Sequence, residues 1–528
     1  MKMRKLLTWL LIIAMLLTSV MLVSCKGNDD DDDDDDDDDE LPEDQLSPSF
    51  DGTTKKYSGN YTVLTEVDRN KGQAFNIVDL VETDNKGDST IIKAVRERNE
   101  KVKTNFGVNI KRRQEADTVN FAKKQVQAEE ATFDAFMLGV NGGLQVACQG
   151  GILDLNEDVE YLDLSQEWWD QGVNENLLLA RKAYIAVGDL LTVDKDGTWC
   201  VLFNKANLVN KQQGLTDQIL YSLVKDGDQA AGGWTVDKLM EYAALHYTRE
   251  TNTDANGEIY EPNYAGNGMY GLYTQKECAT VLLQSGGFTP TVLDSNEQSG
   301  VKDNLNNNPA FDNAVLKIKT VFGDVAAEDW FLDLNTVCDN NAGEDRWETY
   351  ARASFKNNRA TFFMCHIGTI DLVSDMSADF GVLPVPKLYN EQLEYANTIQ
   401  YGNSHCYILP DRNKDQLNEK AGYILEALCY YSSQEFADTD SLNYAYYNKV
   451  LRGKGTRDDD SWKMLDYIFD NRVYDLACAL NISGVNSAVM SATCTSTGNW
   501  TSTKGTNLTS LAGAINKQLE TLMLAELT

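Results

Sequence analysis

The sequence is poor in histidine and in basic residues, and both shortages exclude classes of function. Its 528 residues include 3 histidines, 47 lysines and arginines, and 81 aspartates and glutamates, which give a formal net charge of −34. His246, His366 and His405 lie far apart in the sequence, and none belongs to a set with metal-ligand spacing. Binding of nucleic acid needs clustered basic side chains, and the chain has no long basic stripe. We therefore expect no nucleic-acid partner, no specific metal site and no cofactor.

Motifs that identify common enzyme classes are also absent. No GxSxG, HExxH, P-loop or GxGxxG motif stands between an expected strand and an expected helix. The ten cysteines occur singly without a CxxC pair, and several, such as Cys365 and Cys429, have apolar neighbours. These spacings predict buried free thiols. Acidic residues are so numerous that a glycosidase pair is recognisable only from geometry.

Long apolar runs are missing except at the N-terminus. Three basic residues among the first five precede an apolar stretch, Leu6–Val23, which is followed by Ser24 and Cys25. This is the composition of a secretory signal peptide, although the stretch is also just long enough for an uncleaved anchor. The motif LVSC at residues 22–25 resembles the bacterial lipoprotein signal. That resemblance implies a signal peptide at residues 1–24 and a lipid on Cys25 that holds the protein at a membrane.

A dense run of negative charge follows Cys25. Residues 29–39 are eleven consecutive aspartates, and residues 29–44 hold fourteen acidic residues and no basic one. The run lacks the glycine turn and the spaced oxygen ligands of a calcium loop. Because like charges repel, it predicts an extended tether. We therefore expect residues 25–72 to be the lipidated cysteine and an acidic, disordered tether.

Hydrophobic periodicity predicts an α/β fold for the rest of the chain. Apolar residues make up 42% of the sequence, enough for two or more lobes. Ile91, Ile92, Val95 and Val102 have helical spacing, and short apolar runs alternate with such helices, as in a largely parallel sheet. Strands are expected at 74–81, 133–138, 182–187, 199–204, 360–364 and 380–383, and a further strand is expected directly after a turn at 106–110. Further helices are expected at 121–130, 235–244, 311–322 and 420–432.

Tryptophan and tyrosine point towards sugar binding. Aromatic rings stack on the C–H faces of sugars, and sugar hydroxyls pair with Asp, Asn and Arg side chains. Trp168 and Trp169 are adjacent, and two adjacent side chains cannot both point inward from a regular strand. We therefore expect at least one of them to be exposed or to face a cleft.

Seven segments, in this order, resemble extracellular solute-binding proteins of ABC importers, of the maltose-binding type. The resemblance covers roughly residues 73–525. Two departures concern the ligand: Asn358 stands where the family has a glycine, and the stretch Cys365–Ile370 lacks the family's sugar-stacking tryptophan. The segments are Ala147–Leu155, Tyr184–Asp189, Leu202–Lys205, Gly233–Leu239, Phe355–Met364, Gly381–Pro386 and Gln400–Pro410.

The resemblance implies a two-lobed α/β fold of the type II periplasmic-binding-protein kind, with a hinge of crossing strands and a cleft between the lobes. Lobe 1 is expected at residues 73–190 and about 395–450, and lobe 2 at about 191–394 and 451–528. Crossing segments are expected within Gly188–Leu202 and Val385–Asn403. Such a protein is not an enzyme: it closes on a carbohydrate and presents it to an ABC permease. The expected location is the extracellular face of the cytoplasmic membrane in a single-membrane bacterium.

The expected ligand-binding residues lie on loops that would face such a cleft. A lipid-anchored glycoside hydrolase and a surface adhesion or peptide-binding module are the alternative functions. The candidate residues are Glu82, Asp84, Trp168, Trp169, Asp189, Trp199, His366, Asp371, Tyr401 and Asn403.

Overall fold

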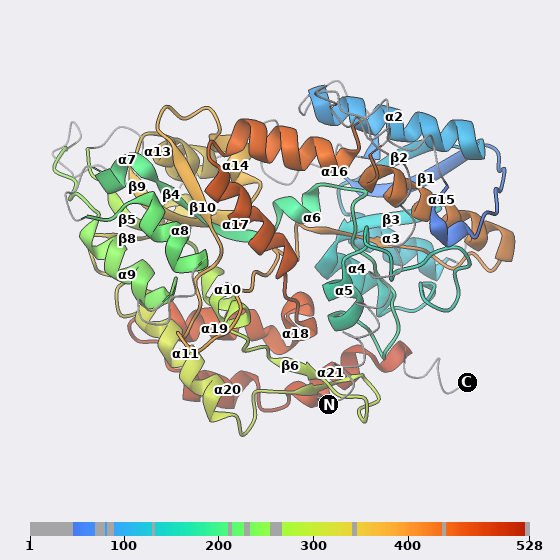
Figure 1. Ribbon diagram of the computed structural model, residues 1–528. Coiled ribbons are helices and arrows are strands. Elements are labelled where there is room, and N and C mark those ends of the chain that lie inside the picture. The colour runs from blue at the N-terminus through green and yellow to red at the C-terminus, as the bar shows by residue number, and fades with distance from the viewer. Residues whose placement is uncertain are drawn as a thin grey trace, which may run out of the picture. The chain divides into compact units, whose positions relative to one another are not determined.

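The computed structural model describes most of the chain after residue 45. The expected signal peptide, Cys25 and the aspartate run lie outside the described residues. Residues from Pro42 to Thr528 belong to one compact unit, which contains two separate main sheets with helices around them (Figure 1). The predicted α/β class is confirmed. The described residues are 46–68, 80–81, 89–128, 132–209, 214–225, 233–253, 267–340, 346–435 and 440–522.

The first sheet has the strand order β11-β3-β1-β2. Its first three strands in the sequence run parallel, and β11 is antiparallel to β3 at one edge. In β1, Val63 packs in one core cluster with Val102 and Phe106, while its neighbour Leu64 belongs to another cluster. Both faces of the sheet are therefore covered, as alternation along a strand requires. The strands are β1 (Asn60–Glu66), β2 (Asn109–Glu115), β3 (Ala135–Gly139) and β11 (His405–Ile408).

Helices α2 (Ser89–Phe106) and α15 (Asp415–Ser433) pack against each other beside this sheet (Figure 1). Helices α3 (Thr118–Gln127) and α4 (Val140–Ala147) also contact each other, and α4 contacts β3 and β11. The buried residues of α2 follow the apolar spacing of three and four that predicts an amphipathic helix.

The folded body begins earlier than residue 73. Ser47 caps a short 3-10 helix, Pro48–Phe50, and the fully buried ring of Phe50 stacks on Tyr423 at a centroid distance of 3.8 Å. Strand β1 then lies in the middle of the first sheet. The prediction of a disordered tether up to residue 72 is therefore wrong for residues 46–66. Their sequence is polar enough to resemble a linker, and the sheet supplies the burial that fixes them.

The second sheet has the order β10-β4-β9-β5-β8. Strand β5 is parallel to β8 and β9, whereas β4 is antiparallel to β9 and β10. Nearly every residue of the central strands is buried, so these strands read as continuous apolar runs. The strands are β4 (Trp199–Asn204), β5 (Tyr270–Thr274), β8 (Phe331–Asp333), β9 (Ala360–His366) and β10 (Phe380–Leu383).

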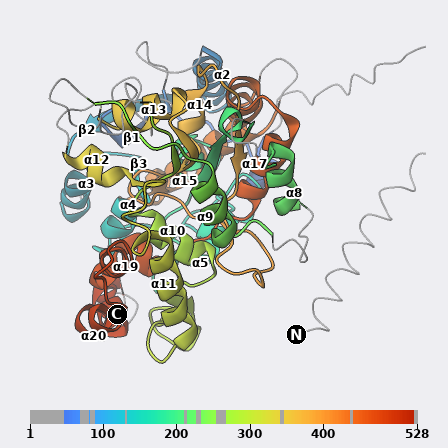
Figure 2. The ribbon, with the colours of Figure 1, turned by 90° about the vertical axis from the view of Figure 1, so that its left-hand side faces the viewer.

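Helices α10 (Cys278–Ser285), α11 (Pro309–Phe322) and α19 (Val485–Thr493) pack together, as Figure 2 shows. The start of α11 is fixed by Asn308, whose side chain accepts a hydrogen bond from the backbone N–H of Phe311 at 3.2 Å, and by Pro309 in the first turn. Helix α19, from the C-terminal part of the chain, thus lies beside α10, the helix that follows β5.

The remaining elements complete the body around the two sheets. Strands β6 and β7 form a separate antiparallel hairpin. The remaining elements are the strands β6 (Thr291–Leu293) and β7 (Val301–Asp303) and the helices α5 (Gln171–Asn176), α6 (Val193–Asp196), α7 (Lys205–Val209), α8 (Asp217–Lys225), α9 (Val236–Leu245), α12 (Leu334–Asn340), the π-helix η3 (Glu348–Arg352), α13 (Ala353–Lys356), α14 (Thr369–Val373), α16 (Leu442–Tyr444), the π-helix η4 (Ala445–Gly455), α17 (Asp459–Asp470), α18 (Leu476–Leu480), the 3-10 helix η5 (Ile482–Gly484), α20 (Trp500–Asn507) and α21 (Leu511–Gln518).

Three segments of the chain meet between the two sheets, and we call them the three passages. The first two passages contain Thr198 and Ile399, which form an isolated antiparallel bridge, and the third contains Arg472, which bridges to Asn397. The two expected crossing segments thus lie side by side. The lobe boundaries expected from sequence place a further crossing near residue 450, and Arg472 lies beyond it. The lobe boundaries stay a prediction.

Two further predictions have different outcomes. Residues 182–187 form only isolated bridges, such as that between Ala186 and Tyr407, so the prediction of a regular strand there is wrong. The expected strand at 74–81 lies almost entirely outside the described residues. In the described ranges, every helix is too short or too polar to cross a bilayer.

Candidate ligand-binding site

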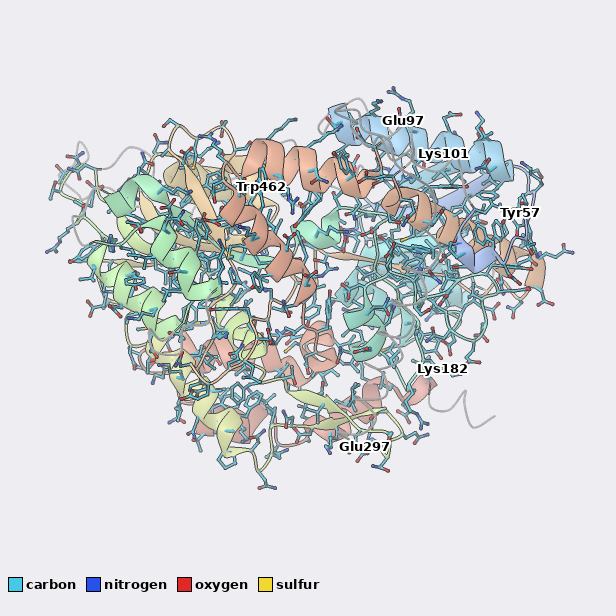
Figure 3. The ribbon with its side chains drawn as sticks, viewed as in Figure 1. Tyr57, Glu97, Lys101, Lys182, Glu297 and Trp462 are labelled. Atoms are coloured by element: carbon cyan, nitrogen blue, oxygen red, sulfur yellow. The ribbon has the colours of Figure 1, made fainter. Side chains whose placement is uncertain are left out.

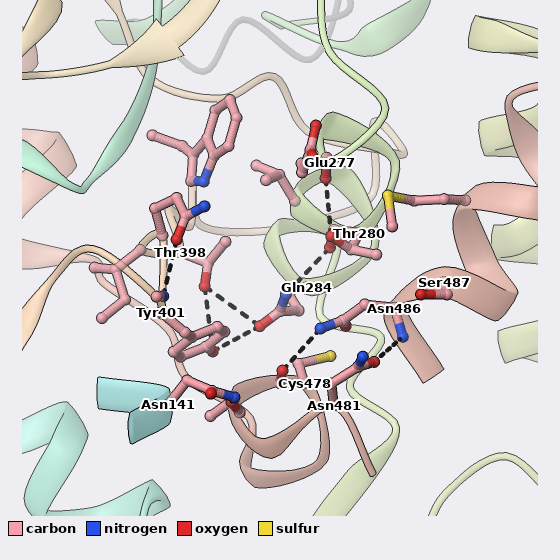
Figure 4. Close-up of a pocket in the computed structure, with 17 residues that line it drawn as sticks. Asn141, Glu277, Thr280, Gln284, Thr398, Tyr401, Cys478, Asn481, Asn486 and Ser487 are labelled. Carbon is pink, nitrogen blue, oxygen red and sulfur yellow. Dashed lines mark hydrogen bonds between the residues drawn. The ribbon is translucent and has the colours of Figure 1, made fainter. Parts of the chain in front are cut away.

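A pocket of about 280 Å³ lies where the carboxyl ends of β3 and β5 meet the second and third passages (Figure 4). Carboxyl ends of strands in open α/β sheets are where ligands bind. We call it the central pocket. It is lined by Asn141, Trp199, Glu277, Thr280, Val281, Gln284, Thr398, Ile399, Gln400, Tyr401, Gly402, Cys478, Ala479, Asn481, Asn486, Ser487 and Met490.

Asn141 enters the pocket from the first turn of α4, directly after β3. The backbone N–H of Asn141 donates to the carbonyl of Tyr401 at 2.9 Å, and that of Val140 donates to the carbonyl of Ser404 at 2.8 Å. A Cβ at Gly139 would lie 2.3 Å from the carbonyl oxygen of Gly402. Glycine at position 139 therefore lets the second passage approach the end of β3 closely and fixes the position of Asn141.

Helix α10 supplies one wall of the pocket. Glu277, Thr280 and Gln284 are three and four residues apart, which places them on one face of the helix. The Thr280 hydroxyl donates to the Glu277 carbonyl at 2.8 Å. The Gln284 amide oxygen accepts from the hydroxyls of Tyr401 at 2.8 Å and Thr398 at 3.3 Å, as the dashed lines in Figure 4 mark. This wall is therefore held rigidly against the second passage.

Two aromatic residues, Trp199 and Tyr401, give the pocket its apolar surface. The Trp199 ring lies 4.0 Å from the ring of His366 between centroids, and burial lowers the pKa of His366 to about 3, so this histidine is neutral at physiological pH. Burial raises the pKa of the Tyr401 hydroxyl well above its usual value. The hydroxyl accepts from the backbone N–H of Asp475 at 2.9 Å. Neither aromatic group therefore brings charge to the pocket.

The segment from α18 to α19 supplies the opposite wall. The Asn486 side-chain amide donates to the Cys478 carbonyl at 2.8 Å, and its backbone N–H donates to the Asn481 side chain at 3.1 Å. The Asn486 amide oxygen is buried and has no hydrogen-bond partner within the described ranges. A buried acceptor left without a partner is costly, so this oxygen is suited to accept a ligand hydroxyl.

The lining is almost uncharged. Among the described lining residues, Glu277 is the only carboxylate, and there is no lysine, arginine or histidine. Five side-chain amides and four hydroxyls supply donors and acceptors. They belong to Asn141, Gln284, Gln400, Asn481, Asn486, Thr280, Thr398, Tyr401 and Ser487. Such a set matches a neutral ligand rich in hydroxyl groups.

Two of the residues expected from sequence, Trp199 and Tyr401, line this pocket, and His366 lies against Trp199. Trp168 and Trp169 do not line it, and both are buried, with exposed fractions of 3% and 2%. The prediction that at least one of them faces a cleft or solvent rested on strand geometry. The two residues instead occupy a turn and an isolated bridge, where alternation does not apply. There Trp168 packs edge-on against Tyr430, and Trp169 donates from its indole N–H to Glu426 at 3.0 Å.

The other expected residues lie outside the central pocket. Asp189 pairs with Lys195 at 2.6 Å, and Asp371 is exposed on α14. The backbone carbonyl of Asn403 lies 2.7 Å from Nδ1 of His405. Glu82 and Asp84 lie outside the described residues. A ligand role for these residues stays a prediction.

Sequence reasoning missed the amide residues Asn141, Gln284 and Asn486. Asn141 had a usable signal, because it stands three residues after the end of an expected strand, where ligands bind in an α/β sheet. Gln284 and Asn486 had none, because each lies on a helix whose pocket-facing side is set by tertiary packing.

No protein-family model matches the chain, and no curated protein matches its sequence. Solved structures of sugar-binding proteins are similar to it over most of its length. The ABC substrate-binding protein from Listeria monocytogenes in complex with cycloalternan has a TM-score of 0.49 and 13% identity, and covers 88% of this chain and 100% of its own. Maltose-bound MalE3 from T. maritima has a TM-score of 0.48, 16% identity and coverage of 88% and 100%. The cyclic alpha-maltosyl-1,6-maltose binding protein from Arthrobacter globiformis has a TM-score of 0.49, 10% identity and coverage of 88% and 99%.

Proposed function

We propose that this chain is a solute-binding protein that captures a neutral carbohydrate in the central pocket. The uncharged lining carries this proposal: amides and hydroxyls surround the rings of Trp199 and Tyr401, with Glu277 as the only carboxylate among the described lining residues. Sugar hydroxyls need many donors and acceptors, and sugar C–H faces need an apolar ring. The lining supplies both.

Other ligand classes fit this lining less well. A free amino acid or a peptide terminus carries charge, and burying an unpaired charge is costly, so a site for it needs opposite charges. A glycoside hydrolase needs two carboxylates across the scissile bond, and the described lining offers one. We therefore infer that the protein binds its sugar without breaking a bond.

Delivery to an ABC permease and attachment to the membrane complete the proposal. The seven ordered segments that resemble solute-binding proteins of ABC importers support the permease partner. The LVSC motif supports lipid on Cys25 and hence attachment to a membrane. The resemblance to long, lipid-anchored binding proteins supports a place on the extracellular face of the cytoplasmic membrane in a single-membrane cell.

Thermal unfolding of the chain from residue 26 onward tests the binding function. We expect neutral saccharides to raise the unfolding temperature, because a ligand specific to the folded state stabilises it, and we expect no saccharide to be cleaved. Asn486→Ala should weaken binding about fivefold, the equivalent of one hydrogen bond of about 1 kcal/mol.

Ser491→Ala is the matched control, because Ser491 lies on the same helix and its hydroxyl donates to the Ala488 carbonyl at 3.0 Å outside the pocket lining. It should bind like the wild type. Turnover of a saccharide, or stabilisation only by amino acids or peptides, would contradict the proposed function.

A further inference from the structure

A second cavity of about 330 Å³ lies beside the central pocket. We call it the hairpin cavity, because β6 and β7 contribute to its lining. It is lined by Asn176, Gln284, Gly287, Thr289, Thr291, Val292, Leu293, Val301, Arg472, Val473, Tyr474, Asp475 and Leu476. Among the described lining residues, Gln284 is the one that the two cavities share.

Gln284 is a fixed part of the wall between the two cavities. Its side chain is buried, with an exposed fraction of 3%. Its amide oxygen accepts the two hydroxyl hydrogen bonds from Tyr401 and Thr398, and its amide nitrogen donates to the Thr280 carbonyl at 3.3 Å. Both lone pairs of the oxygen are therefore engaged within the protein. This geometry fixes Gln284 as a partition between the two cavities.

The wall is also held from the side of the hairpin cavity. The Asp475 carboxylate accepts from the backbone N–H of Thr291 at 2.9 Å and from its hydroxyl at 2.6 Å. It also accepts from the backbone N–H of Cys478 at 2.7 Å, while the backbone N–H of Asp475 donates to the Tyr401 hydroxyl. The hairpin, the third passage and α10 thus share one hydrogen-bond network, and the partition does not depend on Gln284 alone for its position.

The hairpin cavity also offers polar atoms and apolar surface, and in addition Arg472 and Asp475, which are engaged in ion pairs and hydrogen bonds within the protein. Asn176, Thr289 and Thr291 supply polar atoms, and Val292, Val301 and the Tyr474 ring supply apolar surface. A saccharide unit that passed beyond Gln284 would therefore meet hydroxyl partners and C–H contacts of the kind found on the near side.

We propose that Gln284 determines how long a saccharide the central pocket accepts, by closing it against the hairpin cavity. This inference rests on the proposed carbohydrate-binding function. Truncating Gln284 joins the two cavities, so that a ligand one or more sugar units longer fits.

Calorimetry on the chain from residue 26 onward tests this, with maltose to maltotetraose and with mannobiose and mannotriose as ligands. In Gln284→Ala, we expect at least about tenfold tighter binding of the saccharide one unit longer than the longest that the wild type binds well. The affinity for the shorter saccharides should not rise with it, so the ratio of the two affinities is the readout.

Two variants make the result specific. Gln284→Asn keeps the amide but is one methylene shorter, so it should fold like the wild type and show a smaller shift in the same direction. Ser285→Ala truncates the next residue of α10, which is buried and lies in neither lining, and should keep the wild-type length preference.

The outcomes separate this inference from the function on which it rests. Binding of short saccharides by all variants without any change in length preference would overturn the inference and leave the proposed function intact. Absence of saccharide binding by the wild type would overturn both. A shift of equal size in Ser285→Ala would assign the effect to loosening of α10 and overturn the role of Gln284.

Discussion

Glu426 is a fully buried carboxylate that joins three distant parts of the chain. One of its oxygens accepts from the hydroxyls of Ser47 at 2.9 Å and Ser49 at 2.7 Å, and the other accepts from the Trp169 indole at 3.0 Å. Removal from water raises the pKa of Glu426 to about 7, against the opposing effect of these three donors.

This raised pKa makes stability depend on pH in a defined direction. The folded state holds the proton up to about pH 7, whereas the unfolded chain releases it near 4.5. The contribution of Glu426 to the free energy of unfolding therefore falls between about pH 4.5 and 7, by up to about 3 kcal/mol, and is level above that. In Glu426→Gln this loss should be absent. The free energy of unfolding of the variant should therefore increase relative to that of the wild type between pH 5 and pH 8.

Urea unfolding at pH 5, 6.5 and 8 measures this difference. Glu435→Gln, which changes an exposed carboxylate just beyond α15, serves as the control and should follow the wild type. Parallel pH profiles for wild type and Glu426→Gln would contradict the assignment.

Two of the predicted site residues, Trp199 and Tyr401, lie in the lining of the candidate pocket, whereas Trp168 and Trp169 are buried outside it. Trp199 begins a strand that was predicted to the residue, and Tyr401 precedes a strand, so their places follow from the chain order. Trp168 and Trp169 occupy irregular backbone, where no period relates a residue to a face. Their burial depends on partners such as Glu426 and Tyr430, more than 250 residues away in the sequence.

Strand β1 shows at the scale of one element that the N-terminal segment belongs to the core. It pairs with β2 along its whole length and with β3 at Val63 and Leu64. Tyr61, Val63 and Leu64 are all fully buried. Each buried side chain of this size contributes roughly 1.5–3 kcal/mol.

Truncation distinguishes this strand from a dispensable tether. A chain that starts at Leu46 should unfold cooperatively with the midpoint of the longer chain. A chain that starts at Val67 should lose cooperative unfolding, because the first sheet loses its middle strand. Circular dichroism during urea titration is the measurement, and equal midpoints for both truncations would contradict the role of β1.

Helices were easier to predict than this strand for a physical reason. In α2, α11 and α15 the apolar residues recur every three or four positions over 14 to 19 residues, so the signal is repeated several times. Strand β1 has only seven residues, two of them threonine, and follows a long polar stretch. Its burial comes from β2, β3 and the helices around them, which a local pattern does not contain.

Arg472 connects the passages at the scale of the whole body. Its guanidinium pairs with Asp170 at 2.6 Å and with Asp194 at 3.2 Å, and the Tyr474 hydroxyl also bonds to Asp170. All of these side chains are largely buried. Burial raises the pKa of Asp194, while the charges of Lys195 and Arg472 oppose that rise.

Arg472→Met should lower the free energy of unfolding by about 3–5 kcal/mol at pH 8, because it leaves two buried carboxylates without their cation. The loss should be smaller at pH 5. Without the guanidinium, burial raises the pKa of Asp194 further, so the folded state takes up a proton there more readily than the unfolded chain does and stability falls as pH rises.

Urea unfolding of the variant at both pH values is the measurement. Arg457→Met removes an exposed ion pair with Asp379 and should cost less than about 1 kcal/mol at either pH. An equal loss for Arg472→Met at pH 5 and pH 8 would contradict the electrostatic explanation.

The segment from Leu46 to Tyr57 also determines how the body bears mechanical load. Besides the bonds of Ser47 and Ser49 to Glu426, its contacts include the Phe50–Tyr423 stack and the bonds of Tyr57 and Lys55 to Glu419, close to where Figure 3 labels Tyr57. A pull on the chain before Leu46 first meets these contacts and then reaches β1 along its own axis. Tension along β1 would load the backbone hydrogen bonds of its parallel ladder to β2, which runs from Asn60 and Asn109 to Glu66 and Glu115. The segment from Leu46 to Tyr57 is thus the point where tension enters the fold, and β1, an inner strand of the first sheet, bears it next.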